Sequence, residues 1–331
     1  MKAILHEGAS GMEGLKYAEI DNAEPEKGEV RIKLKTAGLN HRDLFVPNRH
    51  KAEDPALVLG SDGAGIVDAV GAGVENVKAG DEVIINPSLG WEKNSDVPPK
   101  GFEIVGLPFH GTFAEYITVP AENAVEKPGY LSWEEAGVLA LSAMTAYRAL
   151  FTRAKVTKGM TVLIPGATGG AGTFLMQFAA AAGATVYVTS RSEEKRSEAL
   201  ELGADKAIDS EADWNEALSG EKVDVVIESV GAATFNKSVD QLRRGGTLVA
   251  FGASAGDTVE FDLRKFFYGQ YNLLGSTMAS AEELHEMLDF IKQHELKPVM
   301  DQSYPLSDFE EAFDRLENAG MMGKIVFNVE Q

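Results

Sequence analysis

The 331-residue sequence contains no cysteine. This absence excludes disulfide bonds, a thiolate nucleophile and any thiolate metal site. Basic residues are also scarce, because 31 lysines and arginines face 51 aspartates and glutamates and the formal net charge is −20. A charge of this sign repels phosphate backbones and anionic lipid surfaces, so we expect neither nucleic acid nor a membrane as a partner.

Long apolar runs are absent as well. The apolar stretches are interrupted well short of the length that spans a bilayer. The first residues, MKAILHEGAS, lack the apolar core and the cleavage site of a secretory signal and indicate a first strand. We therefore expect a cytoplasmic protein, and the length allows two domains.

The first third of the chain has short apolar runs separated by Gly, Pro and Asp, which is typical of antiparallel strands in a barrel-like domain. We expect strands at residues 30–34, 65–70, 82–85 and 113–119. Residues 86–109 are rich in proline and charge and have no clean periodicity. They predict a long surface lobe, and such loops often border a site.

From residue 158 the pattern changes to strands that alternate with helices, which indicates a doubly wound parallel sheet. The fold class is therefore α/β, with this sheet beside a mostly antiparallel β domain. We expect strands at 162–164, 185–190, 206–209, 224–229, 247–252 and 273–276. Amphipathic helices are expected at 282–293 and 308–319, and a closing strand at 324–329.

A glycine-rich turn between the strand at 162–164 and an alanine-rich helix carries the strongest functional signal. Ala167, Gly169 and Gly172 occupy the three small-residue positions of a dinucleotide-binding fingerprint. Small residues there allow a tight turn, a close approach of the pyrophosphate and close helix packing, and the helix N-terminus attracts the phosphates. The candidate cofactor-binding residues of this turn are Thr168, Gly169, Gly170, Ala171 and Gly172.

The next strand of this fingerprint ends in Ser190, Arg191 and Ser192, with Lys195 following. An NAD site typically has an acidic residue there, whereas a hydroxyl and two cations suit the 2′-phosphate of NADPH. We therefore predict a preference for NADPH through Ser190, Arg191 and Lys195. The alternative is that the two cations belong to a solvated helix start.

Several ordered motifs run over essentially the whole chain. They include GLNHRDLF, LGSDGAGIVDAVGAGV, AGDEVI, GTFAEYITVP, SAMTAYRAL, DVVIESVG, RRGGTLVAFGA, LLGSTM and GKIVF. With these motifs the sequence resembles the medium-chain dehydrogenase/reductase superfamily, nearest its zinc-free quinone oxidoreductase-like and zinc-type alcohol dehydrogenase-like branch. The resemblance implies a GroES-like catalytic domain at 1–123 and a Rossmann domain at 124–265 whose last strand lies near 272–277. It also implies a segment at 278–331 that returns to the catalytic domain, a cofactor in the cleft between domains, and a homodimer.

The sequence departs from the zinc-dependent members of that superfamily at the three positions that hold the catalytic metal. Asn40, Ser61 and Leu141 stand where those members have cysteine, histidine and a cysteine or acidic residue. Amide, hydroxyl and isobutyl groups cannot replace those ligands, so no catalytic zinc is expected. The lobe at 86–109 lacks the four cysteines of a structural zinc, and the six histidines are scattered, so we predict no metal site.

Without a Lewis acid, quinones and α,β-unsaturated carbonyls (enals and enones) are easier substrates than unactivated alcohols. We expect Asn40 to donate to the substrate oxygen and His41 or solvent to supply a proton. The alternatives are a buried amide that satisfies its neighbours and a surface or domain-bridging histidine. Family position places Thr145 near the nicotinamide. It also places Phe251, Gly252 and Ala253 beside the nicotinamide ring, and Ser229 and Val230 beside the adenosine half, where simple strand-end packing is the competing interpretation.

Two other functions fit the same sequence. The first is a zinc-free oxidoreductase of ordinary carbonyls and alcohols, and the second is a catalytically silent NADPH-binding protein. The dinucleotide motif cannot separate them because fold and cofactor are shared.

Overall fold

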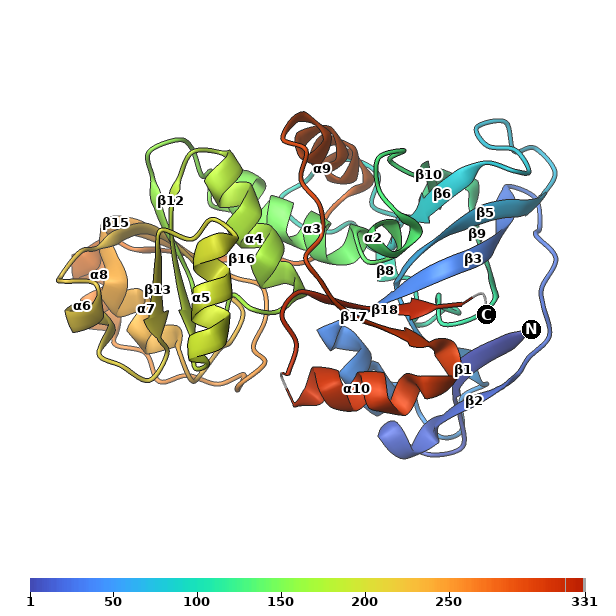
Figure 1. Cartoon of the computed structure of the whole chain (residues 1–331), viewed down its shortest axis with the longest axis horizontal. Coiled ribbons are helices and arrows are strands. Elements are labelled where there is room, and N and C mark those ends of the chain that lie inside the picture. The colour runs from blue at the N-terminus through green and yellow to red at the C-terminus, as the bar shows by residue number, and fades with distance from the viewer. Residues whose placement is uncertain (319, 330–331) are drawn as a thin grey trace. The chain divides into compact units, whose positions relative to one another are not determined.

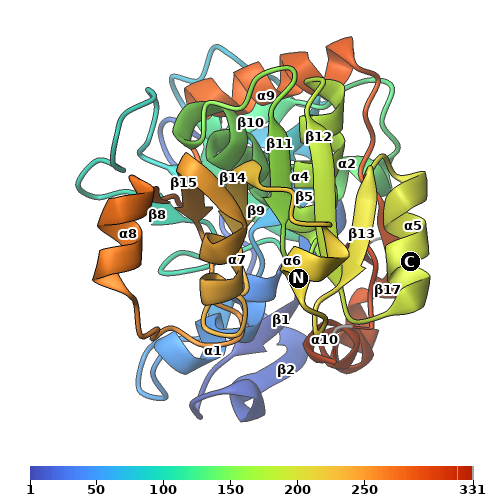
Figure 2. The ribbon, with the colours of Figure 1, turned by 90° about the vertical axis from the view of Figure 1, so that its left-hand side faces the viewer.

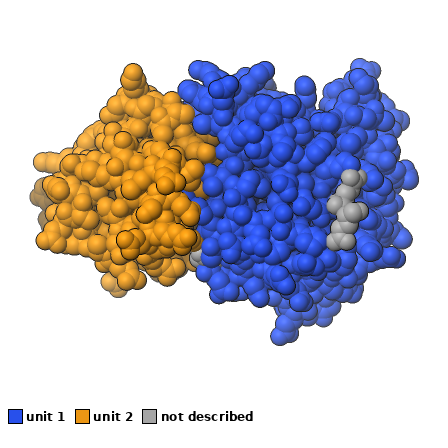
Figure 3. All heavy atoms as spheres, in the orientation of Figure 1, with its two compact units in different colours: residues 1–142, 280–331 blue, residues 143–279 orange. Residues whose placement is uncertain are grey.

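The computed structural model describes residues 1–318 and 320–329. The chain forms two compact units, one made of Met1–Ser142 and Ser280–Gln331 and the other of Ala143–Ala279 (Figure 3). Each unit has its own sheets and its own hydrophobic core. None of the helices within the described ranges combines the length and the apolar character needed to span a lipid bilayer.

The largest sheet of the first unit is mostly antiparallel (Figure 1). Strand β3 lies at its centre and pairs with β5, β9 and β18. Buried and less buried residues alternate through most of β3, which is the pattern of a strand with one face on a core. The sheet order is β10-β6-β5-β3-β18-β17, and β9 also pairs with β3. Its strands are β3 (Glu29–Leu39), β5 (Asp62–Val70), β6 (Glu82–Ile85), β9 (Tyr116–Pro120), β10 (Ala124–Glu126), β17 (Met300–Pro305) and β18 (Lys324–Asn328).

A second sheet and an amphipathic helix complete the core of this unit. Strand β1 (Lys2–His6) pairs with β2 (Leu15–Glu19) and β4 (Leu57–Val58). Helix α10 (Phe309–Glu317) buries residues at helical spacing on one face. Its Phe313 packs against Phe113, whose ring in turn lies 5.0 Å from that of Phe327 in β18. The predicted helix at 308–319 is therefore present, although residue 319 lies outside the described residues.

The compact units divide the chain at a different place from the expected boundary between residues 123 and 124, because residues 124–142 belong to the first unit. Strand β10 pairs with β6. Helix α2 (Trp133–Gly137) approaches β3 so closely that a Cβ on Gly137 would lie 2.2 Å from Thr36 Oγ1. At its other end the second unit runs to Ala279, close to residue 278, where the returning segment was expected to begin.

The lobe at 86–109 is exposed over much of its length but is anchored at Trp91. The side chain of Trp91 is only 1% exposed. Its carbonyl oxygen accepts a hydrogen bond from the amide of Ala281, at the start of helix α9 (Ala281–Gln293). The lobe also contains the short strands β7 (Ser88–Leu89) and β8 (Glu103–Ile104). It is thus tied to the C-terminal segment, which its lack of periodicity did not indicate.

The second unit contains six parallel strands in the order β13-β12-β11-β14-β15-β16 (Figure 2). This is the strand order of a dinucleotide-binding doubly wound sheet, so the expected fold class is confirmed. The strands are β11 (Thr161–Ile164), β12 (Thr185–Ser190), β13 (Lys206–Asp209), β14 (Val223–Glu228), β15 (Leu242–Ala250) and β16 (Asn272–Gly275). Its helices include α4 (Gly170–Ala181), α5 (Glu193–Glu201), α6 (Trp214–Ala217), α7 (Phe235–Gln241) and α8 (Leu263–Gly269).

Several short elements were not predicted. Among them, helices α7 and α8 are short, and β17 carries few apolar residues. A further short helix, α1 (Val46–Arg49), follows the 3₁₀ turn His41–Leu44, and α3 (Ala140–Tyr147) continues into a π-helical segment, Arg148–Arg153. Short elements give too few turns for a periodic pattern to be recognised.

Candidate active site

The glycine-rich turn lies at the carboxyl end of β11, the central strand of the second unit. Gly166 has a φ of +64°, which glycine adopts without strain. A Cβ on Gly172 would lie 2.6 Å from the backbone of Ala167, so only glycine allows this packing of helix on turn. Helix α4 begins without a side-chain cap, so its first amide groups are available to a ligand. The turn therefore fits a diphosphate.

The segment after β14 lies against this turn, and the end of β15 lies against that segment. A Cβ on Gly166 would approach Val230 Cγ2 to 2.8 Å, so the segment after β14 contacts the turn. The amide of Phe251 donates to the carbonyl oxygen of Glu228 at 3.0 Å, and a Cβ on Gly252 would meet the carbonyl of Ser229 at 3.0 Å. Five predicted cofactor residues therefore lie together at the carboxyl ends of β14 and β15: Ser229, Val230, Phe251, Gly252 and Ala253.

A buried carboxylate that we did not predict shapes this edge. Glu228 accepts hydrogen bonds from the amides of Val230 and Gly231 at 2.7 and 3.1 Å. It also accepts bonds from the hydroxyls of Thr234 and Ser238. The signal in the sequence was an acidic residue at the end of an apolar strand, where a charge must find partners.

The end of β12 carries the residues predicted to select NADPH. Ser190 is buried and Arg191 is exposed. Lys195 lies in the first turn of α5, where its amide donates to the Ser192 hydroxyl. A further cation, Arg196, donates to the carbonyl oxygens of Ser190 and Arg191 at 2.8 and 3.0 Å. Arg196 was missed because only the fold shows that its side chain returns to the strand end.

Asn40 stands where zinc-dependent members have their first zinc ligand, and it is part of a buried polar network in the first unit. The amide nitrogen of Asn40 donates to Asp62 at 2.9 Å and to the carbonyl oxygen of Gly38 at 3.3 Å. Its oxygen accepts bonds from Lys324 at 2.5 Å and from Ser142 at 3.0 Å. Both N–H bonds of the amide are thus engaged. These contacts favour the alternative interpretation of Asn40, a buried amide that satisfies its neighbours.

An ion pair lies at the centre of this network. Lys324 Nζ is 3.5 Å from Asp62 Oδ2, and both residues are at most 2% exposed. Burial lowers the pKa of Lys324, against the opposing effect of Asp62 and Asp43. The second carboxylate, that of Asp43, accepts a hydrogen bond from the main-chain N–H of Asn40 at 2.9 Å. Burial raises the pKa of Asp43 to about 6. Sequence reasoning missed Lys324 because it is far from Asn40 in the chain.

Ser61 and Leu141, which stand at the other two zinc-ligand positions of the zinc-dependent members, also form hydrogen bonds within the protein. The Ser61 hydroxyl contacts the guanidinium of Arg42 and donates to the carbonyl oxygen of Val105 at 2.6 Å. Leu141 donates its amide to Asp62 at 2.7 Å. In the part of the chain that the structure describes, no group of three or more metal-ligating side chains is arranged around a common point. These residues do not fit a zinc ion.

The remaining predicted residues have different surroundings. His41 is exposed, and its ring lies edge to face with Phe45, with centroids 5.3 Å apart. Thr145 is buried in α3, next to the π-helical segment.

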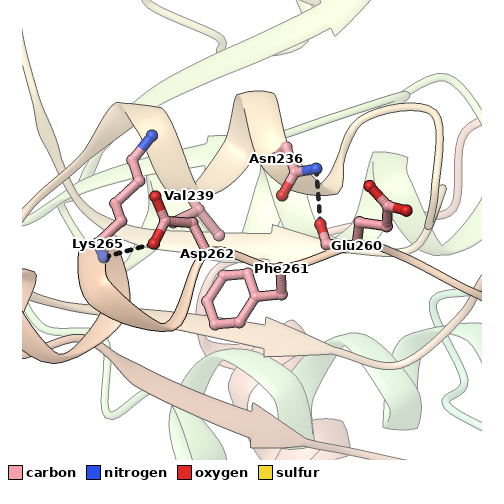
Figure 4. Close-up of a pocket in the computed structure, with 6 residues that line it drawn as sticks. All are labelled: Asn236, Val239, Glu260, Phe261, Asp262 and Lys265. Carbon is pink, nitrogen blue, oxygen red and sulfur yellow. Dashed lines mark hydrogen bonds between the residues drawn. The ribbon is translucent and has the colours of Figure 1, made fainter.

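A hollow of about 450 Å³ lies between α7 and α8, and none of the predicted site residues lines it (Figure 4). Its lining residues are Asn236, Val239, Glu260, Phe261, Asp262 and Lys265.

Comparison with known proteins relates both units to characterised families. Residues 26–129 match the family described as alcohol dehydrogenase GroES-like domain, and residues 170–293 match the family described as zinc-binding dehydrogenase. A zinc-type alcohol dehydrogenase-like protein of Schizosaccharomyces pombe is 33% identical over 350 residues, which cover 100% of this chain and 99% of that protein.

Two solved structures illustrate the range of relatives. A crystal structure of an NAD-dependent alcohol dehydrogenase has 36% identity and a TM-score of 0.93, with 100% of both chains covered. A crotonyl-CoA carboxylase/reductase in complex with NADP has 25% identity and a TM-score of 0.89, with 99% of this chain and 94% of that chain covered.

The dinucleotide-binding sheet edge, together with these matches, defines an oxidoreductase that uses a nicotinamide cofactor. Its second unit supplies the parallel sheet, and its first unit the mostly antiparallel β domain. The chain belongs to the medium-chain dehydrogenase/reductase superfamily.

Proposed function

We propose that this protein is an NADPH-dependent reductase of quinones or α,β-unsaturated carbonyls that works without zinc. The observation that carries the proposal is the set of groups at the three metal-ligand positions. Asn40, Ser61 and Leu141 are bonded to protein partners, and none offers an imidazole, thiolate or carboxylate. A conjugated carbonyl suits such a site because its reduction needs hydrogen-bond donors and a proton rather than a Lewis acid.

The cofactor would be held by the carboxyl edge of the parallel sheet. The N-terminus of α4 and the turn Thr168–Gly172 suit the diphosphate, and Ser190, Arg191 and Lys195 suit a 2′-phosphate. Reduced NADPH, when bound, supplies the hydride. Thr145 and Phe251–Ala253 near the nicotinamide, and Ser229 and Val230 near the adenosine, are proposed on family position.

We further propose a homodimer joined through the second unit and, from the sequence alone, a cytoplasmic location. Strand β16 ends the parallel sheet on one side, so its outer main-chain groups are free of strand partners within the described residues. Next to it in the chain, helix α8 exposes Leu263, Phe267 and Tyr268 by 69%, 50% and 61%. Apolar side chains beside an open strand edge support association of two copies.

The test is a panel of quinones, enals, enones and simple ketones at equal concentration, with NADPH consumption followed by absorbance. Turnover of quinones or enones that survives a chelator is the expected result. Turnover confined to simple carbonyls and alcohols would support the alternative that the names of the alcohol dehydrogenase relatives favour. NADPH binding without turnover would identify a silent binding protein.

A further inference from the structure

Hydrogen bonds hold the guanidinium of Arg42 beside Ser61, one of the three residues at the metal-ligand positions of the zinc-dependent members. Its Nη1 donates to the Ser61 hydroxyl and to the carbonyl oxygen of Val105, the latter at 3.2 Å. The only proton of the Ser61 hydroxyl goes to Val105 at 2.6 Å, so this hydroxyl accepts from Arg42. Ser61 is fully buried. Two buried acceptors therefore fix one end of the guanidinium.

The other end of the guanidinium keeps its donors. A guanidinium has five N–H bonds, of which Nη1 supplies two. Among the described residues, the hydrogen bonds of Arg42 all start at Nη1, so Nε and Nη2 retain three donors. The side chain is half-buried, so part of it remains accessible to solvent. Burial lowers the pKa of Arg42, and arginine nevertheless stays charged at neutral pH.

Two aromatic side chains flank Arg42 in the chain. The rings of His41 and Phe45 pack edge to face, with centroids 5.3 Å apart, and Phe45 is 43% exposed. An aromatic surface beside a cation with free donors matches a planar, conjugated molecule that carries an oxygen anion.

We propose that Arg42 binds the substrate oxygen and stabilises the negative charge that forms on it. This inference rests on the proposed function. Addition of a hydride to the electron-poor carbon moves the π electrons onto the substrate oxygen, and a proton from His41 or water then completes the two-electron reduction that oxidises NADPH. A guanidinium fixed by Ser61 and Val105 meets that charge with little reorganisation. Arg42 takes over the charge stabilisation that the bonded amide of Asn40 does not offer.

The first experiment measures anion binding without turnover. The probe is 4-nitrophenol, because only its anion absorbs strongly in the visible range. The wild-type protein is expected to bind the anion and to increase its fraction near neutral pH. Arg42→Gln is expected to weaken this binding by roughly tenfold or more, the usual effect of losing a charge-assisted bond. Arg42→Lys keeps the charge but loses the fork, so an intermediate affinity is expected.

Two further variants serve as controls. Arg244→Gln removes an exposed arginine of β15 in the second unit and is expected to leave anion affinity unchanged. Ser61→Ala removes the acceptor that orients Arg42 and is expected to lower anion affinity while NADPH affinity stays normal. Wild-type affinity in a folded Arg42→Gln overturns the proposal. If Arg42→Gln does not fold by circular dichroism, wild-type affinity in both Arg42→Lys and Ser61→Ala overturns it equally.

The second experiment compares turnover of a quinone and an enone by the same variants. Arg42→Gln is expected to lower kcat roughly a hundred- to a thousandfold with normal NADPH affinity. A wild-type protein that binds the anion through Arg42 but reduces no conjugated carbonyl refutes the proposed function and leaves the anion site standing. A wild-type protein that reduces these substrates, with Arg42→Gln keeping kcat and anion affinity, refutes the role of Arg42 alone.

Discussion

The two units build their candidate sites from different parts of the chain. In the second unit, the turn from Gly166 to Gly172 is a continuous segment of main chain in which an added Cβ would collide with neighbouring atoms. In the first unit, Asn40 and Lys324 are 284 residues apart in the sequence and share a hydrogen bond in the fold. The first kind of site is sensitive to steric bulk and the second to buried charge, and four predictions test this difference.

The largest effect is expected from Lys324→Met. Removing one partner of a buried ion pair leaves an uncompensated charge, here on Asp62, and typically lowers the free energy of unfolding by about 3–5 kcal/mol. Urea unfolding of the full chain measures the loss. Adding Asp62→Asn should restore part of it. The control is Lys297→Met, which breaks a pair between the exposed Lys297 and the half-buried Glu135 and is expected to cost about 0–1 kcal/mol. Equal losses in the two lysine variants would contradict a special role of the buried network.

The second prediction concerns the choice of cofactor. Arg191 and Lys195 at the end of β12 favour a 2′-phosphate, and one charge-assisted contact is worth about 1.5–3 kcal/mol, or roughly tenfold to more than a hundredfold in affinity. NADPH is therefore expected to bind more tightly than NADH by that factor. Arg191→Ala should reduce the preference, whereas Arg264→Ala, an exposed arginine in α8, should not. Fluorescence titration gives the dissociation constants, and equal values for both cofactors in the wild type would refute the prediction.

The third prediction is steric. Gly172→Ala places a Cβ about 2.6 Å from the backbone of Ala167, so the turn must move. Overpacking of this kind typically costs about 1–3 kcal/mol, and weaker NADPH binding is expected to accompany it. Gly129→Ala is the matched control because nothing lies within 4 Å of its added Cβ. Calorimetry and cofactor titration measure both effects, and normal NADPH affinity in Gly172→Ala would separate the turn from cofactor binding.

The smallest effect is the pH dependence of the first unit. Burial raises the pKa of Asp43 to about 6, so the folded state takes up a proton there while the unfolded chain does so nearer 3.8. Its contribution to stability therefore increases as the pH falls from 7.5 to 5. The difference in free energy of unfolding between the wild type and Asp43→Asn should grow over that range.

His6 provides the opposite sign and therefore a control. Burial lowers its pKa, and its Nδ1 lies 2.8 Å from Nδ1 of the buried His50. A depressed histidine pKa gives stability that is present above about pH 6.5 and is lost as the pH falls. The difference in free energy of unfolding between the wild type and His6→Gln should therefore shrink as the pH falls from 7.5 to 5. Parallel changes in the two differences would show that neither residue governs the response.

The sequence by itself determined the features that depend on neighbours in the chain. Alternation of strands and helices predicted the parallel sheet, since burial on both faces requires apolar strands and covering helices. The glycine-rich turn was found because its steric requirement is met by residues within one short segment. The lack of cysteine and the residues Asn40, Ser61 and Leu141 likewise bear on zinc without any knowledge of the fold.

Only the tertiary structure decided which distant side chains meet. The bonds of Asn40 to Lys324 and Asp62, and the contact of Arg42 with Ser61, join segments that no local pattern relates. The boundary at Ser142, rather than at residue 123, also follows from the packing of α2 on β3. The physical reason is that a buried polar group must find a partner, but the fold, not the local sequence, selects which partner it finds.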